Sequence, residues 1–284
     1  MPVGYSYYKT IALTGVSGAG ANYSVYLTVG ESALASGANF HLVGHGLNFP
    51  YDIRFTNADG TVDLDFYIED VFGTAPNRTV RVWVEVQDNL NSAQSIRCYY
   101  GNASAVDASN FGNVFAVAST PWTESFESSF SWTSNGSFSR VSDKAQAGSW
   151  AVKATTGTTS AYRQNGWSEY GSPTTGMLMV FNTYCWSDTA GKAKINLSVG
   201  SGRAIFGQGL LNQWELIRSL ALVNTATEGA PNHDIRSLVG SGNIWYDNMS
   251  IQRLTRVVVS PNPTFSSESA ETYIGFFPVT FNFI

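Results

Sequence analysis

The stretch with the densest carboxylates, FTNADGTVDLDFYIED at residues 55–70, could bind calcium or form a β-hairpin turn. An EF-hand loop needs oxygen ligands at positions one, three and five, glycine at six and a bidentate glutamate at twelve. If Asp59 and Gly60 take positions five and six, positions one and twelve are Phe55 and Phe66, which cannot ligate a metal. An Asp-Gly pair between alternating apolar residues is typical of a hairpin. We therefore predict a hairpin here.

Two histidines, His41 and His45, are four residues apart and would face one way on a helix, as paired zinc ligands do. Gly44 and Gly46 favour a loop instead, and a zinc site needs at least a third ligand. The remaining histidine, His233, is distant in the sequence. We expect no zinc site.

Catalytic patterns are missing from the sequence. The carboxylates, such as Glu69, Asp70, Glu85 and Glu169, show no spacing that singles out an acid and base pair. There is no Gly-x-Ser-x-Gly motif, and the glycine-rich GVSGAGAN lacks the lysine of a phosphate-binding loop. We expect that the protein is not an enzyme.

Sugar recognition uses flat aromatic faces together with a few polar groups. The candidates, which lie in or beside expected loops of the second half, are Trp167, Tyr170, Tyr184 and Trp186. Each could instead fill a sandwich core, the commoner place for a large aromatic side chain. Trp83, Trp132 and Trp214 alternate within strand patterns, and we assign them to cores.

The composition favours β-sandwiches with an exterior surface. Charged residues make up only 13% of the 284 residues, aromatics reach 14%, and 284 residues suffice for two domains. The net charge of −5 with 16 Lys and Arg provides no basic stripe, so nucleic acid is not an expected partner. Cys98 and Cys185 lie in strand-like runs of different halves, where buried free thiols are expected.

No signal peptide is visible after Met1, and no apolar run reaches the roughly 18 residues of a membrane span. An exterior-type protein without such a signal could be a shortened chain, use another secretion route, or leave the cell by lysis within a virion. The expected location is a virion surface or the extracellular space.

Short runs with period-two alternation, separated by Gly, Asn and Asp, indicate an all-β chain. We predict two antiparallel β-sandwich (jelly-roll-like) domains, at residues 1–118 and 119–255. Residues 256–284 are predicted as a Pro- and Ser-rich linker followed by an apolar C-terminal β-strand arm.

The first half carries, in order, YYKTIALTG, NYSVYLTV, DIRFTNADGTVDLDFYIED, VRVWVEV and CYYGNASAVDASN. On these segments residues 5–115 resemble domain-of-unknown-function family 2341, with a departure at Phe66 and Tyr67, where the family usually has tyrosine and tryptophan. The resemblance implies a β-sandwich module of large cell-surface, secreted and viral proteins, commonly beside lectin-like domains. It implies no known catalytic residues.

The second half resembles jelly-roll carbohydrate-binding modules. Their first strand carries Phe-Glu before a Trp, and their last strand carries a Tyr-Asp-Asn or Tyr-Asp-Asp pattern. The matching positions are Phe126, Glu127, Trp132, Trp214, Tyr246, Asp247 and Asn248. In these modules a glutamate of the first strand and an aspartate of the last often share a structural calcium, so the resemblance implies such an ion at Glu127 and Asp247. The alternative is two solvated carboxylates.

The chain ends in TYIGFFPVTFNFI, which is uncharged, apolar and β-prone, and such an edge needs a cover. We predict that this arm adds a strand to a neighbouring copy. The arm residues are Tyr273, Ile274, Phe276, Phe277, Val279, Phe281 and Phe283.

These patterns predict a non-catalytic structural surface protein, foremost a virion component (capsid decoration, tail or fibre). It would assemble through its C-terminal arm with copies of itself or with other virion or surface proteins, and it could adhere to glycans. The alternative is a secreted or cell-surface module that binds polysaccharide, or an accessory part of a polysaccharide-degrading system.

Overall fold

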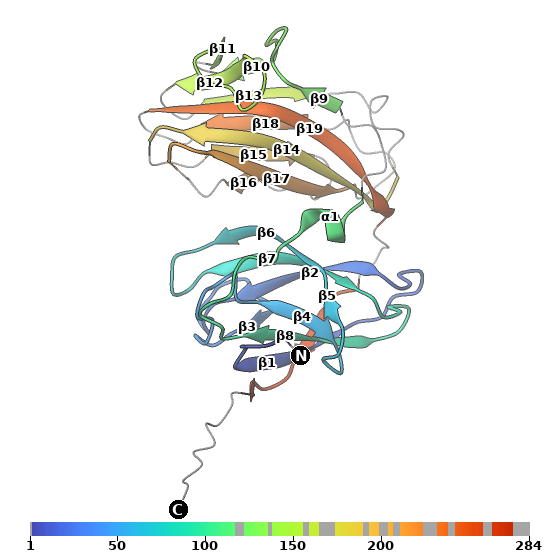
Figure 1. The fold of residues 1–284 in the computed structure, drawn as a ribbon. Helices are drawn as coiled ribbons and strands as arrows, with labels where there is room; N and C mark the ends of the chain where they lie inside the picture. The colour runs from blue at the N-terminus through green and yellow to red at the C-terminus, as the bar shows by residue number, and fades with distance from the viewer. Residues whose placement is uncertain are drawn as a thin grey trace, which may run out of the picture. The chain divides into compact units, whose positions relative to one another are not determined.

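The computed structural model of the chain describes residues 2–116, 122–135, 138–155, 159–164, 174–189, 193–198, 204–206, 211–223, 232–237, 242–257 and 263–274. The chain forms two compact units, of which the first combines residues 1–114 with 261–284 and the second holds 115–260 (Figure 1). In the described residues the one helix is α1 (Phe111–Val114), so the predicted all-β fold is confirmed. No helix in this part of the chain is long and apolar enough to cross a membrane.

The first unit contains two sheets. One has the order β20 (Phe265–Glu268), β1 (Tyr7–Leu13), β8 (Gln94–Tyr100), β4 (Arg54–Asn57) and β5 (Asp63–Leu64), with β21 (Thr272–Tyr273) also on β1. The other has the order β3 (Phe40–His41), β2 (Tyr23–Gly30), β7 (Thr79–Val86) and β6 (Phe66–Phe72). The pairs are antiparallel except β2 with β3.

The predicted hairpin lies between β4 and β5. Buried Phe55 pairs with buried Leu64, and Gly60 has a φ of +81°, as its place in the turn requires. The Asn57 amide donates to the Val62 carbonyl at 3.0 Å, which closes the turn. The hairpin interpretation of this acidic stretch is therefore confirmed.

The described residues of the second unit also form two sheets. One has the order β10 (Thr133–Asn135), β13 (Thr159–Gln164), β18 (Asn232–Ser237), β15 (Ala193–Ser198) and β16 (Ala204–Phe206). The other has the order β11 (Phe138–Val141), β12 (Ala151–Thr155), β19 (Asn243–Val257), β14 (Met177–Ser187) and β17 (Trp214–Leu222), with β9 (Trp122–Glu124) on β19. We call the latter the β14 sheet.

The core of the second unit takes side chains from both of its sheets. Met179 and Tyr246 come from the β14 sheet, Ile195 and Ile235 come from the facing sheet, and all four are buried. Trp132 packs into the same core, as predicted. This two-sided burial is the packing expected of a β-sandwich.

Both cysteines are buried free thiols, in accordance with the prediction. Burial raises the pKa of the Cys98 and Cys185 thiols well above the ordinary value. Thiols in such surroundings are inert packing groups rather than nucleophiles.

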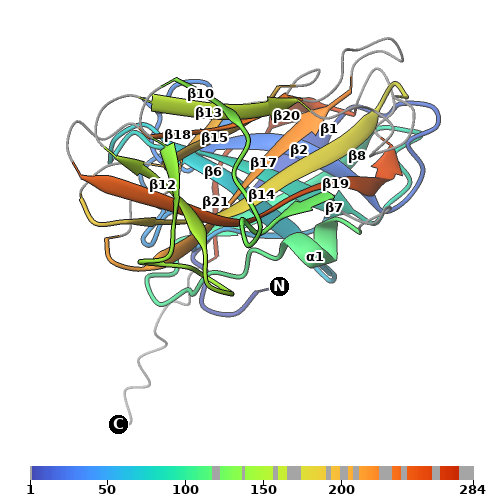
Figure 2. The ribbon, with the colours of Figure 1, turned by 90° about the horizontal axis from the view of Figure 1, so that it is seen from above.

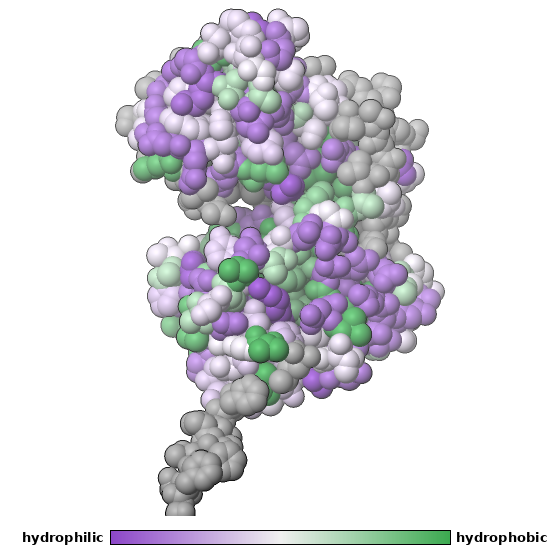
Figure 3. Space-filling view, in the orientation of Figure 1, coloured by the Kyte–Doolittle hydropathy of each residue, from purple (hydrophilic) through white to green (hydrophobic). Residues whose placement is uncertain are grey.

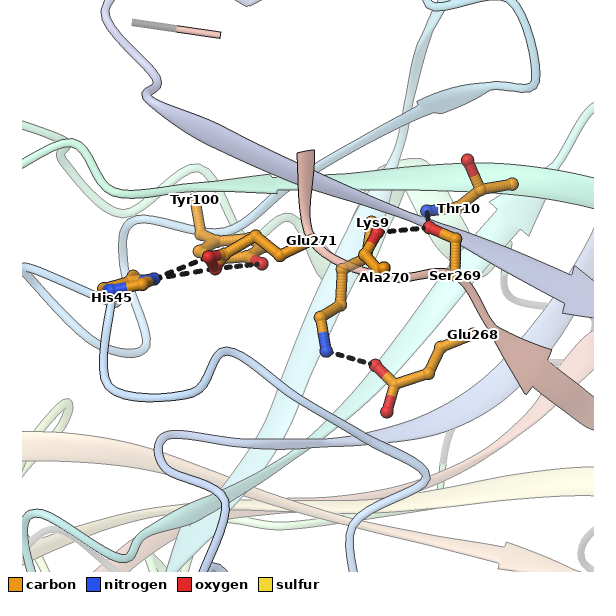
Figure 4. Close-up of polar contacts among 8 residues, drawn as sticks. All are labelled: Lys9, Thr10, His45, Tyr100, Glu268, Ser269, Ala270 and Glu271. Carbon is orange, nitrogen blue, oxygen red and sulfur yellow. Dashed lines mark hydrogen bonds and ion pairs between the residues drawn. The ribbon is translucent and has the colours of Figure 1, made fainter. Parts of the chain in front are cut away.

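Residues 263–274, which we call the strap, follow the second unit in sequence and pair with β1 of the first unit. The strap contains the strands labelled β20 and β21 in Figure 2. Lys9 on β1 is 6% exposed, and its ammonium lies 2.6 Å from a carboxylate oxygen of Glu268 (Figure 4). Glu271 accepts a hydrogen bond from the Tyr100 hydroxyl at 3.0 Å and lies 2.7 Å from Nδ1 of His45. The segment expected to be a linker therefore contains a strand of the first unit.

The predicted assembly arm falls partly within the strap. The Tyr273 backbone pairs with Tyr7 of its own chain, and Ile274 packs against the buried cluster that contains Tyr99, so both residues already have contacts within the chain. The other arm residues lie outside the described residues: Phe276, Phe277, Val279, Phe281 and Phe283. The sequence predicted that the first domain ends at residue 118 and the second at residue 255. In the structure the second unit begins at residue 115 and ends at residue 260.

Candidate functional site: an aromatic row and a carboxylate pair

Strand β14 has one face in the core of the second unit and one face directed away from it. Cys185 and Phe181 belong to the core cluster. Because side chains alternate along a strand, Trp186 and Tyr184 lie on the opposite face. Both side chains are partly exposed there.

Three tryptophans line up across this face on neighbouring strands. Trp186 of β14 is directly opposite Trp245 of β19 on one side and Trp214 of β17 on the other. Lys153 of β12 continues the line beyond Trp245. Since neighbouring strands lie about 5 Å apart, Trp214, Trp186 and Trp245 occupy adjacent positions across one face of the sheet. We call these three residues the aromatic row.

Two rings of the aromatic row, those of Trp186 and Trp245, contact each other, and each also contacts a lysine. The Trp186 and Trp245 ring centroids are 5.0 Å apart with the planes at 87°, an edge-to-face contact. The Lys144 ammonium lies 3.4 Å from the Trp186 centroid, and that of Lys153 lies 4.5 Å from the Trp245 centroid. Both distances are within the range of cation–π attraction.

Asp143 fixes the inner end of the aromatic row. Its Oδ1 accepts a hydrogen bond from the Trp245 indole N–H at 2.8 Å, and its Oδ2 lies 3.2 Å from the Lys153 ammonium. Burial by itself would raise the pKa of Asp143, but the hydrogen bonds from Trp245 and Lys153 outweigh it and lower that pKa. Asp143 therefore remains ionised and holds the Trp245 ring in place.

The structure brings together two of the four aromatic residues predicted to bind sugars. Tyr184 and Trp186 share one face of β14, two residues apart, within a strand rather than a loop. Trp167 and Tyr170 lie outside the described residues.

Two members of the aromatic row were missed from the sequence. Trp214, which alternation assigned to a core, is partly exposed and opposite Trp186, so that assignment is wrong. Trp245 immediately precedes the Tyr-Asp-Asn pattern, and its position next to buried Tyr246 was the signal for the outer face.

The two predicted calcium ligands lie around one loop, residues 146–150. Oε1 of Glu127 accepts hydrogen bonds from the amides of Ser149 and Trp150, each at 2.9 Å. Oδ2 of Asp247 accepts from the amides of Gln146 at 2.8 Å and Ala147 at 3.2 Å. We call Glu127 and Asp247 the carboxylate pair.

The carboxylate pair carries two negative charges near each other, one of them buried. Asp247 is 0% exposed, and burial raises the pKa of its carboxyl, with a further rise from the charge of Glu127. Three backbone amides, those of Gln146, Ala147 and Asn248, oppose this rise without cancelling it. An added cation would relieve the repulsion.

The side-chain atoms of the carboxylate pair that could ligate a metal are of the type that calcium prefers. Both side chains offer carboxylate oxygens, the ligands that calcium prefers. Of the two carboxylate oxygens of Glu127, only Oε1 accepts a hydrogen bond from the described residues, so Oε2 can ligate. Over the same residues no group of three or more His, Cys, Asp or Glu side chains is placed to hold a metal. Backbone carbonyls and water would have to complete the coordination.

The histidines do not form a metal site with one another. His41 contacts the Ala35 carbonyl at 3.0 Å through Nε2, whereas His45 stacks on Tyr7 with ring centroids 4.4 Å apart. His233 packs against Trp132 in the core of the second unit. Each therefore has a packing role.

On the face drawn in Figure 3, isolated hydrophobic residues are scattered among hydrophilic ones. Scattered apolar residues of this kind are ordinary on a protein surface.

Comparison with known proteins gives one family match. The domain of unknown function DUF2341 matches residues 50–135. This match confirms the resemblance noted for the first half, although it begins later and continues into the second unit. No curated protein matches the chain.

Among solved structures, the chain is similar to carbohydrate-binding modules of the β-sandwich type. The CBM22-1 xylan-binding domain of Paenibacillus barcinonensis Xyn10C is 12% identical, with a TM-score of 0.38, over 50% of this chain and 99% of that one. The CBM22-1–CBM22-2 tandem domain of the same protein is 10% identical, with a TM-score of 0.38, over 88% and 79%. TmCBM61, solved with β-1,4-galactotriose, is 14% identical, with a TM-score of 0.33, over 43% and 88%.

Proposed function

We propose that this protein is a non-catalytic glycan-binding protein whose second unit holds a polysaccharide chain on the aromatic row. The observation that supports this best is the alignment of Trp186, Trp214 and Trp245 on the outer face of the β14 sheet. Sugar rings present C–H surfaces that pack on indole faces, and strands fix those faces more firmly than loops do.

The partly exposed tryptophans are the contact groups in this proposal, and Trp245 is the support. Trp186 and Trp214 are partly exposed, whereas Trp245 is 4% exposed and fastened by Asp143. Tyr184, on the same strand face, extends the contact surface by one step along β14. A rigid row of this kind loses little conformational entropy on binding.

The proposal includes a structural calcium ion at the carboxylate pair. Glu127 and Asp247 would hold it, and the ion would supply positive charge that neutralises the pair. Its role would be to fasten residues 146–150 to the segment that follows β9 and to β19.

Extracellular location accords with a polysaccharide ligand and is part of this proposal. Assembly into a virion remains a prediction. No described residue supports it, and Tyr273 and Ile274 of the expected arm are paired within the chain.

The experiment is affinity electrophoresis against a panel of soluble plant, algal and bacterial polysaccharides. Replacing Trp186 or Trp214 by Ala should weaken binding to any retained polysaccharide about tenfold or more, the size of an aromatic hot spot. Trp150→Ala is the matched control, because Trp150 is a partly exposed tryptophan of the same unit outside the aromatic row. Equal retention of all three variants and the unmodified protein would refute the proposal.

A further inference from the structure

Lys144 occupies a position on the aromatic row that the stacking of neutral sugars does not require. Its ammonium lies 3.4 Å from the centroid of Trp186 and 5.4 Å from that of Trp245. The ammonium therefore sits over the indole that a sugar would use, rather than at the edge of the face. A neutral sugar ring stacking on that side of Trp186 would have to displace a cation and lose the cation–π contact.

The carboxylates near this end of the aromatic row are already engaged by other groups. Asp143 serves Trp245 and Lys153. Asp188 accepts hydrogen bonds from the Asn243 amide at 2.8 Å, from its side-chain N–H at 2.6 Å and from the Thr189 hydroxyl at 2.7 Å. These hydrogen bonds outweigh the effect of burial, which alone would raise the pKa of Asp188, and keep it ionised.

The charges at the aromatic row are thus arranged unevenly. Lys153 offsets Asp143 directly and also attracts Asp188. Among the residues that the structure describes, no carboxylate lies within ion-pair distance of the Lys144 ammonium. The cation on Trp186 is therefore open to a negative charge brought by a ligand.

Resting on the proposed function, we propose that the aromatic row selects acidic glycans, chains that carry uronic acid carboxylates. A uronic acid offers both groups that Trp186 and Lys144 together recognise: C–H faces for the indole and a carboxylate for the ammonium. The Lys144 ammonium would move from the ring to the carboxylate, so the ion pair replaces the cation–π contact and the ring face is released for stacking. Lysine suits this exchange because its charge is compact and its stem flexible.

The test uses matched pairs of polymers and the full chain. The probes are polygalacturonate and glucuronoxylan, each beside the same polymer with its carboxyl groups reduced to alcohols, so that only the charge differs. Binding is measured by isothermal titration calorimetry at low and at physiological salt. In at least one pair we expect the acidic polymer to bind about fivefold tighter, the upper range for a partly exposed ion pair. The difference should shrink as salt screens the pair.

Two variants at one position separate charge from fold. Lys144→Gln should abolish the difference between acidic and reduced polymer, whereas Lys144→Arg should retain it. Equal binding of both members of every pair, or a preference that survives in Lys144→Gln, would overturn the inference. If both members bind equally and the binding depends on Trp186, only the acidic preference fails and the proposed function stands. If the unmodified protein binds no probe and no other polysaccharide, both fail.

Discussion

At the scale of single residues, the carboxylate pair allows the sharpest calcium test. Glu127→Gln keeps the Oε1 acceptor for the Ser149 and Trp150 amides but removes the charge and replaces Oε2 by an N–H group. If calcium binds there, saturation at about 100 times its dissociation constant should stabilise the second unit by about 2.7 kcal/mol. The melting temperature should then rise by roughly 5–10 °C in the unmodified protein and stay constant in Glu127→Gln. Differential scanning calorimetry with calcium and with chelator measures both.

The calcium site would be refuted if calcium raised the melting temperatures of the unmodified protein and Glu127→Gln equally, or raised neither. Glu215→Gln is a control, since Glu215 is a carboxylate of the same unit on a different strand. Its calcium response should match that of the unmodified protein.

Because Asp247 is buried, we expect the stability of the calcium-free protein to depend on pH. Burial, with the charge of Glu127, raises the pKa of Asp247 in the folded state above the ordinary value of 3.8. Between that value and the raised pKa the folded state binds more protons than the unfolded state, so this group makes stability fall as pH rises. Calcium should remove or reverse the slope by favouring the ionised form. Urea denaturation from pH 4 upward, with and without calcium, measures the free energy of unfolding as a function of pH. An identical slope in both conditions would contradict calcium binding at the carboxylate pair.

At the scale of elements, the strap depends on an ion pair with one buried partner. Lys9 is 6% exposed, and Glu268 is its carboxylate partner at 2.6 Å. Glu268→Ala leaves that ammonium without this partner, so we expect a loss of about 3 kcal/mol in the free energy of unfolding of the first unit. Ser266→Ala, at an exposed strap position, should cost less than about 0.5 kcal/mol. Chemical denaturation compares the two.

A second variant distinguishes the charge effect from a general loosening of the strap. Replacing Lys9 by Met and Glu268 by Leu together removes the buried charge and retains apolar contact, so it should recover most of the lost stability. If Glu268→Ala is as stable as Ser266→Ala, the ion pair does not fasten the strap.

The elements also show where sequence reasoning succeeds and where it stops. The β4–β5 hairpin was predictable because an Asp-Gly turn between alternating residues is a local signal. The pairing of β20 with β1 was not, because Ile11 and Glu268 are far apart in the sequence and nothing local encodes their register.

The aromatic row was half predictable for a related reason. In β17 both faces carry apolar residues, with Trp214 and Leu216 on one and Ile217 and Ala221 on the other. Alternation separates two faces, but it does not say which one enters the core. Only the register against Cys185 and Tyr246, both in the core, places Trp214 outside.

At the scale of the whole molecule, the chain leaves the first unit near residue 114, builds the second, and returns at 261. Each unit thus has its own sheets, and the strap belongs to the first one although it follows the second in sequence. We expect two calorimetric transitions, one for each unit. Each transition can be assigned to its unit by a change that acts on that unit alone. Glu268→Ala should lower the transition temperature of the first unit and leave that of the second unit unchanged. Calcium should raise the transition temperature of the second unit and leave that of the first unit unchanged. If both treatments moved a single common transition, the two units would unfold as one cooperative body and the separate roles assigned to strap and carboxylate pair would have to be abandoned.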